Sequence, residues 1–276
     1  MSVGFQWDET LYAGSAPYYR SGRVPYPPGL AQVLAAELSL DGSGRLLDVG
    51  CGPGSLTLLL MPRFASAVGI DADPGMVAEA AAQARRAGCD RVTWRQMRAE
   101  ELPGGLGTFR LITFAQSFHW VDQPLVARAA RGMLDPGGAL AIIHATTHEG
   151  EPGDDRLPSP RPPRQKIAEL IAEYLGPVRR AGRSLIPDGP PWIEDGTLLA
   201  AGFSGRTRAE AGGGLVTRTE DEVVASVFSL SSAAPQQFGD RLGEFERDLR
   251  GVLRSVSPQG RFSERMPGVA VDVWRP

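Results

Sequence analysis

Apolar residues alternate between helical and strand spacing along the first half of the chain. Residues 29–40 carry apolar side chains three and four positions apart, which predicts a helix, whereas the apolar run 45–49 predicts a short buried strand. The same reasoning predicts further helices over 55–61, 74–87 and 124–134, and further strands over 66–70, 91–95, 111–115 and 139–144. Such alternation favours a parallel sheet with helices on both faces and ligands at the carboxyl ends of its strands.

The pattern changes after residue 149. The segment 151–164 contains six prolines or glycines and no apolar periodicity, which predicts a mobile surface loop. Beyond it we expect helices over 165–175, 196–201, 219–229 and 237–254, and strands over 204–210 and 269–274. The expected organisation is a single domain over 1–276: a lid and first helix (1–40), a ligand-binding core (41–148), a small cap insertion (149–201), and C-terminal strands and helices (202–276).

Composition excludes several classes of protein. A chain of 276 residues with 42% apolar residues can bury one sizeable core, and its net charge of -3 and pI near 5.7 argue against a nucleic-acid partner. Cys51 and Cys89 form neither a disulfide framework nor a metal-binding pair, which suits a reducing compartment. The N-terminus lacks a basic start followed by an apolar stretch, and no apolar run approaches the roughly 20 residues that span a bilayer. We therefore expect a cytoplasmic protein without a membrane partner, of undetermined oligomeric state.

Three glycines separate the first strand from the next helix. Gly50, Gly52 and Gly54 form a G-x-G-x-G turn, and Ser55 stands where a dinucleotide fingerprint requires its third glycine. Glycines let the backbone approach a ligand closely, and the start of a helix favours a negatively charged group such as a carboxylate. The turn therefore predicts a ligand that lacks the pyrophosphate of a dinucleotide.

Five segments in order carry a resemblance to a known family. They are DVGCGPG, VGIDADPGMV, RAEELP, LITFAQSFHWVD and LDPGGALAII. Together they resemble the class I S-adenosylmethionine-dependent methyltransferases, in the small-molecule branch similar to methyltransferase type 11. The resemblance implies a Rossmann-like α/β fold with a seven-stranded, mostly parallel sheet, helices on both faces and a terminal antiparallel hairpin whose inserted strand is 269–274.

The same resemblance implies a reaction. S-adenosylmethionine would be the cofactor and S-adenosylhomocysteine the product, with the methyl group passing to O, N or C of a small-molecule acceptor. An alternative stays open, in which the fold binds the cofactor but catalyses a cyclisation or rearrangement without methyl transfer.

Residues around the second strand are candidates for the adenosine part of the cofactor. Asp71 ends that strand, where its carboxylate can accept hydrogen bonds from both ribose hydroxyls, whereas Asp73 suits a helix cap before Pro74. Asp48 has two possible roles. It holds the glycine turn or a water molecule near the methionine part, or it contacts the cofactor directly. Ala72 and Met76 would flank the ribose and adenine, although Met76 also suits ordinary helix packing.

One motif departs from the family pattern. Many relatives place an aspartate before Ala-Glu to accept the adenine amino group, but this chain has Arg98, which cannot accept a hydrogen bond. Adenine recognition would then depend on the backbone at Ala99 and on Glu100. Arg98 itself suits a solvated surface position.

The end of the fourth strand faces the expected site of the reactive methyl group. Ala115, Gln116 and Phe118 are candidates for lining the cofactor pocket. His119 is the candidate general base, needed only if the acceptor carries a proton. The alternative is that His119 and Trp120 only pack this loop.

The N-terminal segment resembles a lid over the cofactor. Matching its pattern places Tyr19 and Arg23 near the methionine carboxylate and methyl group, with Tyr19 a second catalytic candidate. Plain packing of the lid is the alternative.

Other polar residues give weaker signals. His144, His148 and Glu149 lack the spacing of a metal site, so we expect no metal. Five arginines in the expected cap would either attract an acidic substrate or be solvated: Arg161, Arg164, Arg179, Arg180 and Arg183.

Overall fold

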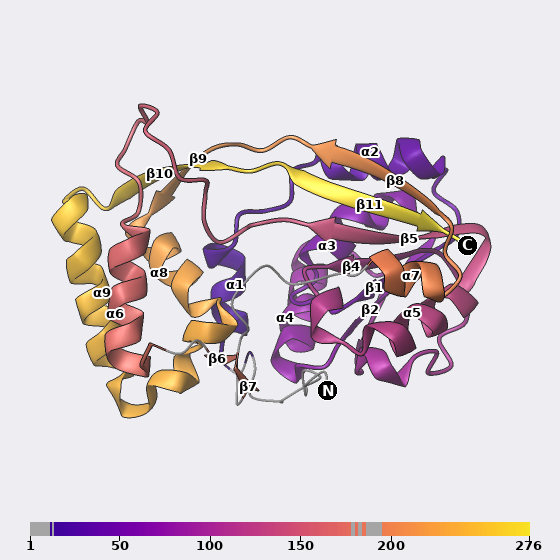
Figure 1. Ribbon diagram of the computed structural model, residues 1–276, viewed down its shortest axis with the longest axis horizontal. Coiled ribbons are helices and arrows are strands. Elements are labelled where there is room, and N and C mark those ends of the chain that lie inside the picture. The colour runs from indigo at the N-terminus through magenta and orange to yellow at the C-terminus, as the bar shows by residue number, and fades with distance from the viewer. Residues whose placement is uncertain (1–11, 13, 178–179, 182–183, 186–194) are drawn as a thin grey trace.

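The structure, a computed structural model, describes residues 12, 14–177, 180–181, 184–185 and 195–276. Seven strands form one sheet in the order β3-β2-β1-β4-β5-β11-β8 (Figure 1). Their bounds are β1 Arg45–Val49, β2 Ser66–Asp71, β3 Val92–Gln96, β4 Phe109–Ala115, β5 Leu134–His144, β8 Gly205–Ala211 and β11 Val269–Arg275. Strands β1 to β5 pair in parallel, and β11 is inserted antiparallel between β5 and β8. The predicted fold class is confirmed, including the inserted strand.

Helices cover both faces of the sheet. Successive residues of a strand point to opposite faces, so a continuous apolar strand supplies a core on each side. Leu46 and Leu111 pack in the core beneath α2 and α3, whereas Leu47 and Ile112 pack in the core beneath α5 and α7. The helices around the sheet are α2 Gly29–Leu38, α3 Ser55–Leu60, α4 Pro74–Arg86, α5 Gln123–Gly132 and α7 Asp195–Ala200. Both faces of the central strands β1, β4 and β5 are therefore buried, as is typical of a parallel sheet.

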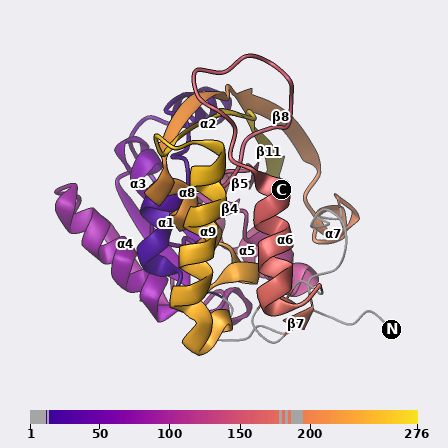
Figure 2. The same ribbon diagram turned by 90° about the vertical axis from the view of Figure 1, so that its left-hand side faces the viewer.

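A third hydrophobic core lies at one end of the molecule. It belongs to α6 (Arg164–Leu175), α8 (Glu220–Phe228) and α9 (Leu242–Val256), which we call the helical cluster (Figure 2). Helix α1 (Ala16–Gly22) packs against α8, and the ring of Tyr18 lies 5.0 Å from that of Phe228. Because α8 and α9 come from the C-terminal part of the chain, the cluster draws on more residues than the expected cap of 149–201. The domain boundaries stay a prediction.

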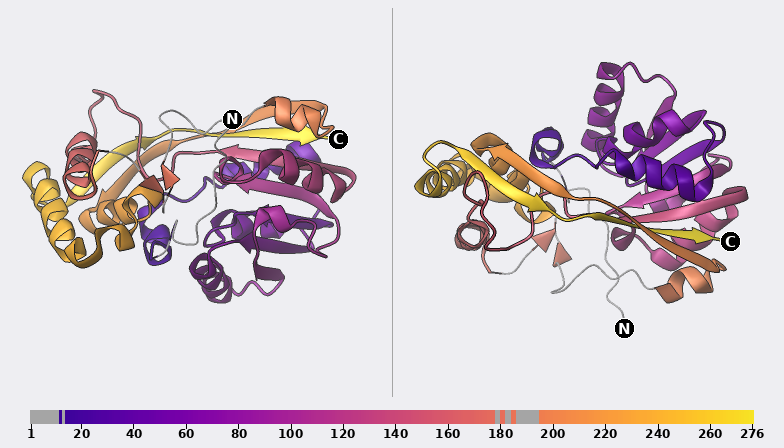
Figure 3. Two further views of the ribbon diagram at one scale, coloured as in Figure 1. Left: turned by 60° about the horizontal axis from the view of Figure 1, so that its bottom comes forward. Right: turned by 90° about the horizontal axis from the view of Figure 1, so that it is seen from above.

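A two-stranded ribbon connects the sheet to the helical cluster. Strands β9 (Gly214–Thr219) and β10 (Arg261–Met266) pair antiparallel and continue β8 and β11 toward the cluster (Figure 3). Neither strand is predicted by the sequence pattern. Gly213 marks the close approach between them, since a Cβ there would lie 2.1 Å from the carbonyl oxygen of Met266. A second small ribbon pairs β6 (Arg180–Ala181) with β7 (Ser184–Leu185).

Two sequence-based boundaries are wrong. The helix expected over 124–134 ends at Gly132, and the strand expected from residue 139 already begins at Leu134, where the pairing with β4 shifts register after Phe109. The expected helix over 237–254 breaks at Gly239, whose φ of 52° is not helical, so a 3-10 segment (Pro235–Arg241) precedes α9. The other 3-10 segments are Met61–Arg63, Ala99–Glu101, Phe118–Trp120 and Ser231–Ala233. Within the described ranges, no helix combines the length and apolar character that crossing a membrane requires.

Candidate functional site

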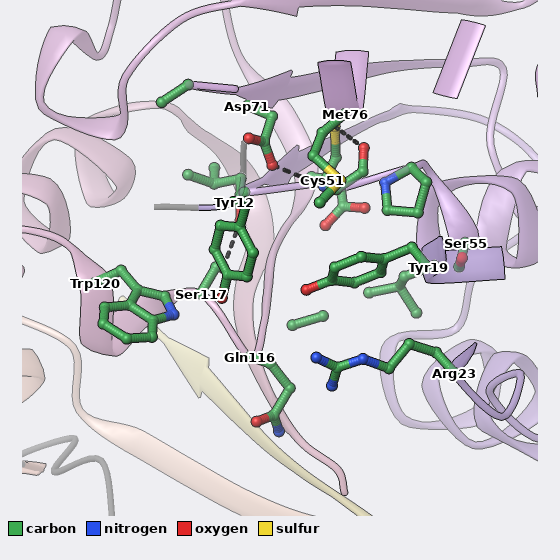
Figure 4. A pocket seen from close by; sticks show the side chains of 18 of the residues that line it. Tyr12, Tyr19, Arg23, Cys51, Ser55, Asp71, Met76, Gln116, Ser117 and Trp120 are labelled. Atoms are coloured by element: carbon green, nitrogen blue, oxygen red, sulfur yellow. Dashed lines mark hydrogen bonds between the residues drawn. The ribbon is translucent and has the colours of Figure 1, made fainter. Parts of the chain in front are cut away.

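A cavity of about 370 Å³ opens at the carboxyl ends of β1, β2 and β4 (Figure 4). This is the edge at which a parallel sheet of this kind binds ligands. Most of the predicted cofactor residues line it: Tyr19, Arg23, Asp48, Gly50, Gly52, Asp71, Ala72, Met76, Ala99, Glu100, Ala115 and Gln116. Gly54 and Phe118 are not among its lining residues.

The glycine turn after β1 needs glycine for a different reason at each position. All three glycines have positive φ, of 68°, 53° and 83° for Gly50, Gly52 and Gly54. A Cβ at Gly50 would lie 2.4 Å from that of Ser117, and one at Gly54 would lie 2.6 Å from the ring of Trp94, whereas one at Gly52 meets nothing within 4 Å. Gly50 and Gly54 therefore permit close packing inside the protein, and Gly52, which lines the cavity, has open space at its Cβ position.

Asp71 joins the end of β2 to the glycine turn. One carboxylate oxygen accepts the backbone N–H of Gly52 at 2.8 Å, and the other accepts that of Asp73 at 2.9 Å. Burial raises the pKa of Asp71 to about 6, against the lowering effect of these two hydrogen bonds. Each oxygen of a carboxylate has two acceptor positions, so both keep one for a ligand. Asp73 caps α4 by accepting the N–H of Met76, as predicted.

Asp48 uses its carboxylate inside the protein. It is fully buried and accepts the hydroxyls of Thr57 at 2.6 Å and Thr113 at 2.8 Å. Burial raises its pKa above the ordinary value. These contacts tie β1 to α3 and β4, and the residue also borders the cavity, so its role toward the glycine turn or the cofactor stays a prediction.

Residues after β3 also line the cavity. Ala99 is buried, and Glu100 accepts the backbone N–H of Asp122 at 3.1 Å, which joins this turn to the start of α5. The Arg98 side chain is 49% exposed and lies 3.4 Å from Glu100. Arg98 borders the cavity at its rim, together with Met97, which the sequence analysis did not select.

The N-terminal segment lines the cavity with aromatic and charged side chains. Arg23 stacks its guanidinium on the ring of Tyr19 at 4.8 Å, and the ring of Tyr12 meets Tyr19 edge-on at 6.1 Å. The backbone of Val24 donates to the carbonyl of Thr147 at 2.7 Å, which fixes this segment beside the end of β5. Burial and the neighbouring Tyr19 raise the pKa of Tyr12 well above its usual range, so its hydroxyl stays neutral.

The turn after β4 places its side chains differently from the sequence expectation. Gln116 has a φ of 56°, and its amide donates to the carbonyl of Ile143 at 3.3 Å beside the cavity. The 3-10 segment then turns Phe118 inward, 4.9 Å from the ring of Phe114, and brings Trp120 to the cavity instead.

His119 packs beside Trp120, with ring centroids 4.8 Å apart, and is not among the residues that line the cavity. Burial lowers its pKa to about 4, and the charge of His144 acts in the same direction. His119 is thus neutral near pH 7. Its predicted role as a base stays a prediction.

The other candidate histidines have structural partners. His144 lies 3.0 Å from Asp272 on β11, and His148 lies 3.4 Å from both Arg23 and Glu149. Among the described residues, no group of three or more His, Cys, Asp or Glu side chains could hold a metal ion.

The cap arginines that the structure describes form ion pairs. Arg161 pairs with Asp155, and Arg164 pairs with the buried Glu264 at 2.8 Å. Arg179 and Arg183, and the side chain of Arg180, lie outside the described residues. Tyr26, Cys51 and Ser117 also line the cavity, although none of them is a candidate from the sequence. Cys51 and Ser117 lie within segments that carry the family resemblance, and Tyr26 lies in the expected lid.

Comparison with known proteins agrees with this geometry. Residues 46–138 match the family model described as a methyltransferase domain. A 2-heptyl-1-hydroxyquinolin-4(1H)-one methyltransferase of Mycobacteroides abscessus is 33% identical over 176 residues, covering 60% of this chain and 74% of that protein. The chain belongs to the class I S-adenosylmethionine-dependent methyltransferases.

Other relatives share the fold or part of the sequence with this chain. An uncharacterized methyltransferase of Mycobacterium tuberculosis (strain ATCC 25618 / H37Rv) is 31% identical over 173 residues, which is 62% of this chain and 63% of that protein. The match thus spans less than two thirds of that relative. The crystal structure of the [4+2]-cyclase SpnF superposes with a TM-score of 0.51 at 18% identity, covering 99% of this chain and 98% of that one, which shows the shared fold.

Proposed function

We propose that this methyltransferase transfers a methyl group from S-adenosylmethionine to O, N or C of a small-molecule acceptor. The observation that carries the proposal is the pair of Asp71 and Gly52 at one edge of the cavity. The carboxylate keeps acceptor positions for two ribose hydroxyls, and the space beside Gly52 admits a ligand that approaches the backbone. The relative from Mycobacteroides abscessus, whose name gives a small-molecule acceptor, supports this class of substrate.

The proposed roles follow the length of the cavity. Ala72, Met76, Ala99 and Glu100 would hold the adenosine end, and Gly50, Gly52 and Ala115 the methionine end. Arg23 would bind the methionine carboxylate, and Tyr19 and Gln116 would close the site around the reacting methyl group. Gly54 and Phe118 would support the site from behind, through Trp94 and Phe114.

The cofactor, when bound, supplies an activated methyl group on a sulfonium. The chain then has to hold the acceptor in line with that group and exclude water, and such alignment can supply most of the acceleration. His119 would act as a base only if the acceptor carries a proton and the loop brings the ring to the cavity.

Two measurements test the proposal. S-adenosylhomocysteine should raise the melting temperature and NAD should not, because the glycine turn lacks the dinucleotide spacing. The reverse ranking would overturn the cofactor assignment. Incubation with cofactor that carries a deuterated methyl group should then add that group's mass to an acceptor. A rearranged substrate together with unchanged cofactor would instead support the alternative of cyclisation or rearrangement without methyl transfer.

A further inference from the structure

Arg23 reaches the cavity from the lid, but the helical cluster holds its guanidinium. Nε donates to the hydroxyl of Ser229 at 2.8 Å, and Nη2 donates to the carbonyl oxygen of the same residue at 2.8 Å. Ser229 follows the last turn of α8, 206 positions along the chain from Arg23. One edge of the guanidinium is thus fixed by a single residue of the cluster.

Ser229 is built into this contact. It is fully buried, and its hydroxyl donates to the carbonyl of Ser226 at 2.7 Å while it accepts from Arg23. Helices α1 and α8 approach so closely that a Cβ at Gly22 would lie 2.3 Å from the carbonyl oxygen of Ala225. The position of Arg23 relative to Ser229 is therefore set by helix packing as well as by hydrogen bonds.

A buried ion-pair network fixes the backbone on both sides of this contact. Arg218 donates to the carbonyl of Gly22, the residue before Arg23, at 2.6 Å, and to that of His148 at 2.9 Å. Arg164 also donates to the His148 carbonyl, at 3.0 Å, and both arginines pair with Glu264. Arg218 and Glu264 are each only 4% exposed, so the network is shielded from water.

The other edge of the guanidinium is only loosely held. Nη1 lies 3.5 Å from the Thr147 hydroxyl and 3.4 Å from Nδ1 of His148, both long for a hydrogen bond. An arginine has five N–H donors, and Ser229 takes two of them. In Figure 4 the guanidinium lies below the Tyr19 hydroxyl and extends from the Ser55 side toward Gln116. Donors on this edge are available to an anionic group in the cavity.

We infer that Ser229 is a positioning residue for cofactor binding: the helical cluster fixes Arg23 through Ser229 so that its loosely held edge binds the methionine carboxylate. This rests on the proposed function, in which Arg23 contacts the cofactor. The helical cluster then serves the cofactor as well as any acceptor, although it lies outside the matched methyltransferase domain.

The test measures the affinity of S-adenosylhomocysteine by calorimetry. Ser229→Ala should weaken it about tenfold, because the guanidinium loses a charge-assisted hydrogen bond and can turn from the cavity. Ser226→Ala is the matched control. It lies on the same helix, is equally buried, and loses an intrahelical hydroxyl bond and a contact to Arg164, yet it does not touch Arg23. Its affinity should stay within twofold of the parent chain.

A double-mutant cycle with Arg23→Met separates the possible outcomes. If Ser229 acts through Arg23, Ser229→Ala should have no further effect once Arg23 is replaced. Equal losses of affinity in Ser226→Ala and Ser229→Ala, or an unchanged affinity in Ser229→Ala, would overturn this inference and leave the proposed function unaffected. An unchanged affinity in Arg23→Met would remove the cofactor role of Arg23, while a thermal shift by S-adenosylhomocysteine would still support the proposed function. Ser229→Cys, with a weaker acceptor of similar size, should give an intermediate loss and serves if Ser229→Ala does not fold.

Discussion

The carboxylate of Asp71 accepts the backbone N–H of Gly52 at 2.8 Å, so the acid that ends β2 is joined directly to the glycine turn that follows β1. This hydrogen bond places a half-buried acceptor beside the one glycine of the turn that leaves open space. The two features together define where a ribose can be recognised, because neither strand end alone supplies both an acceptor and room for a ligand.

The affinity for S-adenosylhomocysteine should depend on pH through Asp71. Burial raises the pKa of Asp71 to about 6, and only the ionised carboxylate accepts hydrogen bonds from both ribose hydroxyls. The ligand therefore binds best above pH 6, and its affinity should fall about tenfold from pH 7 to pH 5 as the carboxyl group takes up a proton. Calorimetric titration across this range measures the effect.

Substitution of Asp71 provides the comparison for that pH dependence. Asp71→Ala should weaken binding at pH 7 by about 1.5–3 kcal/mol, and its affinity should no longer change between pH 5 and pH 7. A variant that keeps the parent affinity would move the ribose elsewhere in the cavity.

Two glycines of the turn should respond differently to alanine. Gly52→Ala should fold, because its Cβ meets no protein atom, although the positive φ costs about 1–2 kcal/mol of backbone strain. The new methyl group should block the ligand and lower affinity more than tenfold. Gly50→Ala should instead lower the melting temperature strongly, since its Cβ would collide with Ser117. Equal effects of both variants on stability, with binding retained in Gly52→Ala, would contradict the proposed ligand position.

The parts of this site that were predictable from sequence are local ones. The turn with Gly50, Gly52 and Gly54 and the acid at Asp71 follow directly from strand ends, and parallel strands bring their carboxyl ends to one edge. The choice between Phe118 and Trp120 was not predictable, because a single 3-10 turn decides which aromatic ring faces the cavity and both suit either place.

Long-range contacts create most of the features that the sequence pattern does not predict. The ribbon of β9 and β10 has no strong apolar alternation, and it forms because β8 and β11 already pair and extend past Gly213. The contact between Arg23 and Ser229 joins segments 206 residues apart, and no periodicity in either segment indicates it. Packing of α1 on α8 creates it.

Arg98→Ala should change the affinity for S-adenosylhomocysteine less than tenfold, which is about 1.4 kcal/mol. Its side chain is half exposed at the rim, its nearest ion-pair partner is Glu100, and a guanidinium cannot accept the adenine amino group. A larger loss in calorimetry would show that Arg98 stacks on the adenine or supports the turn at Ala99.

His119→Ala tests whether a base takes part in the reaction. His119 packs on Trp120, away from the residues that line the cavity, so the substitution should lower the melting temperature and weaken S-adenosylhomocysteine binding through the loop. Alignment can carry methyl transfer without a base, so the shape of the pH–rate profile should stay the same. Because burial holds the pKa of His119 at about 4, a base at this position would already be neutral and active above pH 5, and its removal would lower kcat by about 10²–10⁴-fold across that range. A folded His119→Ala protein that binds S-adenosylhomocysteine normally but has lost kcat to that extent would establish His119 as the base.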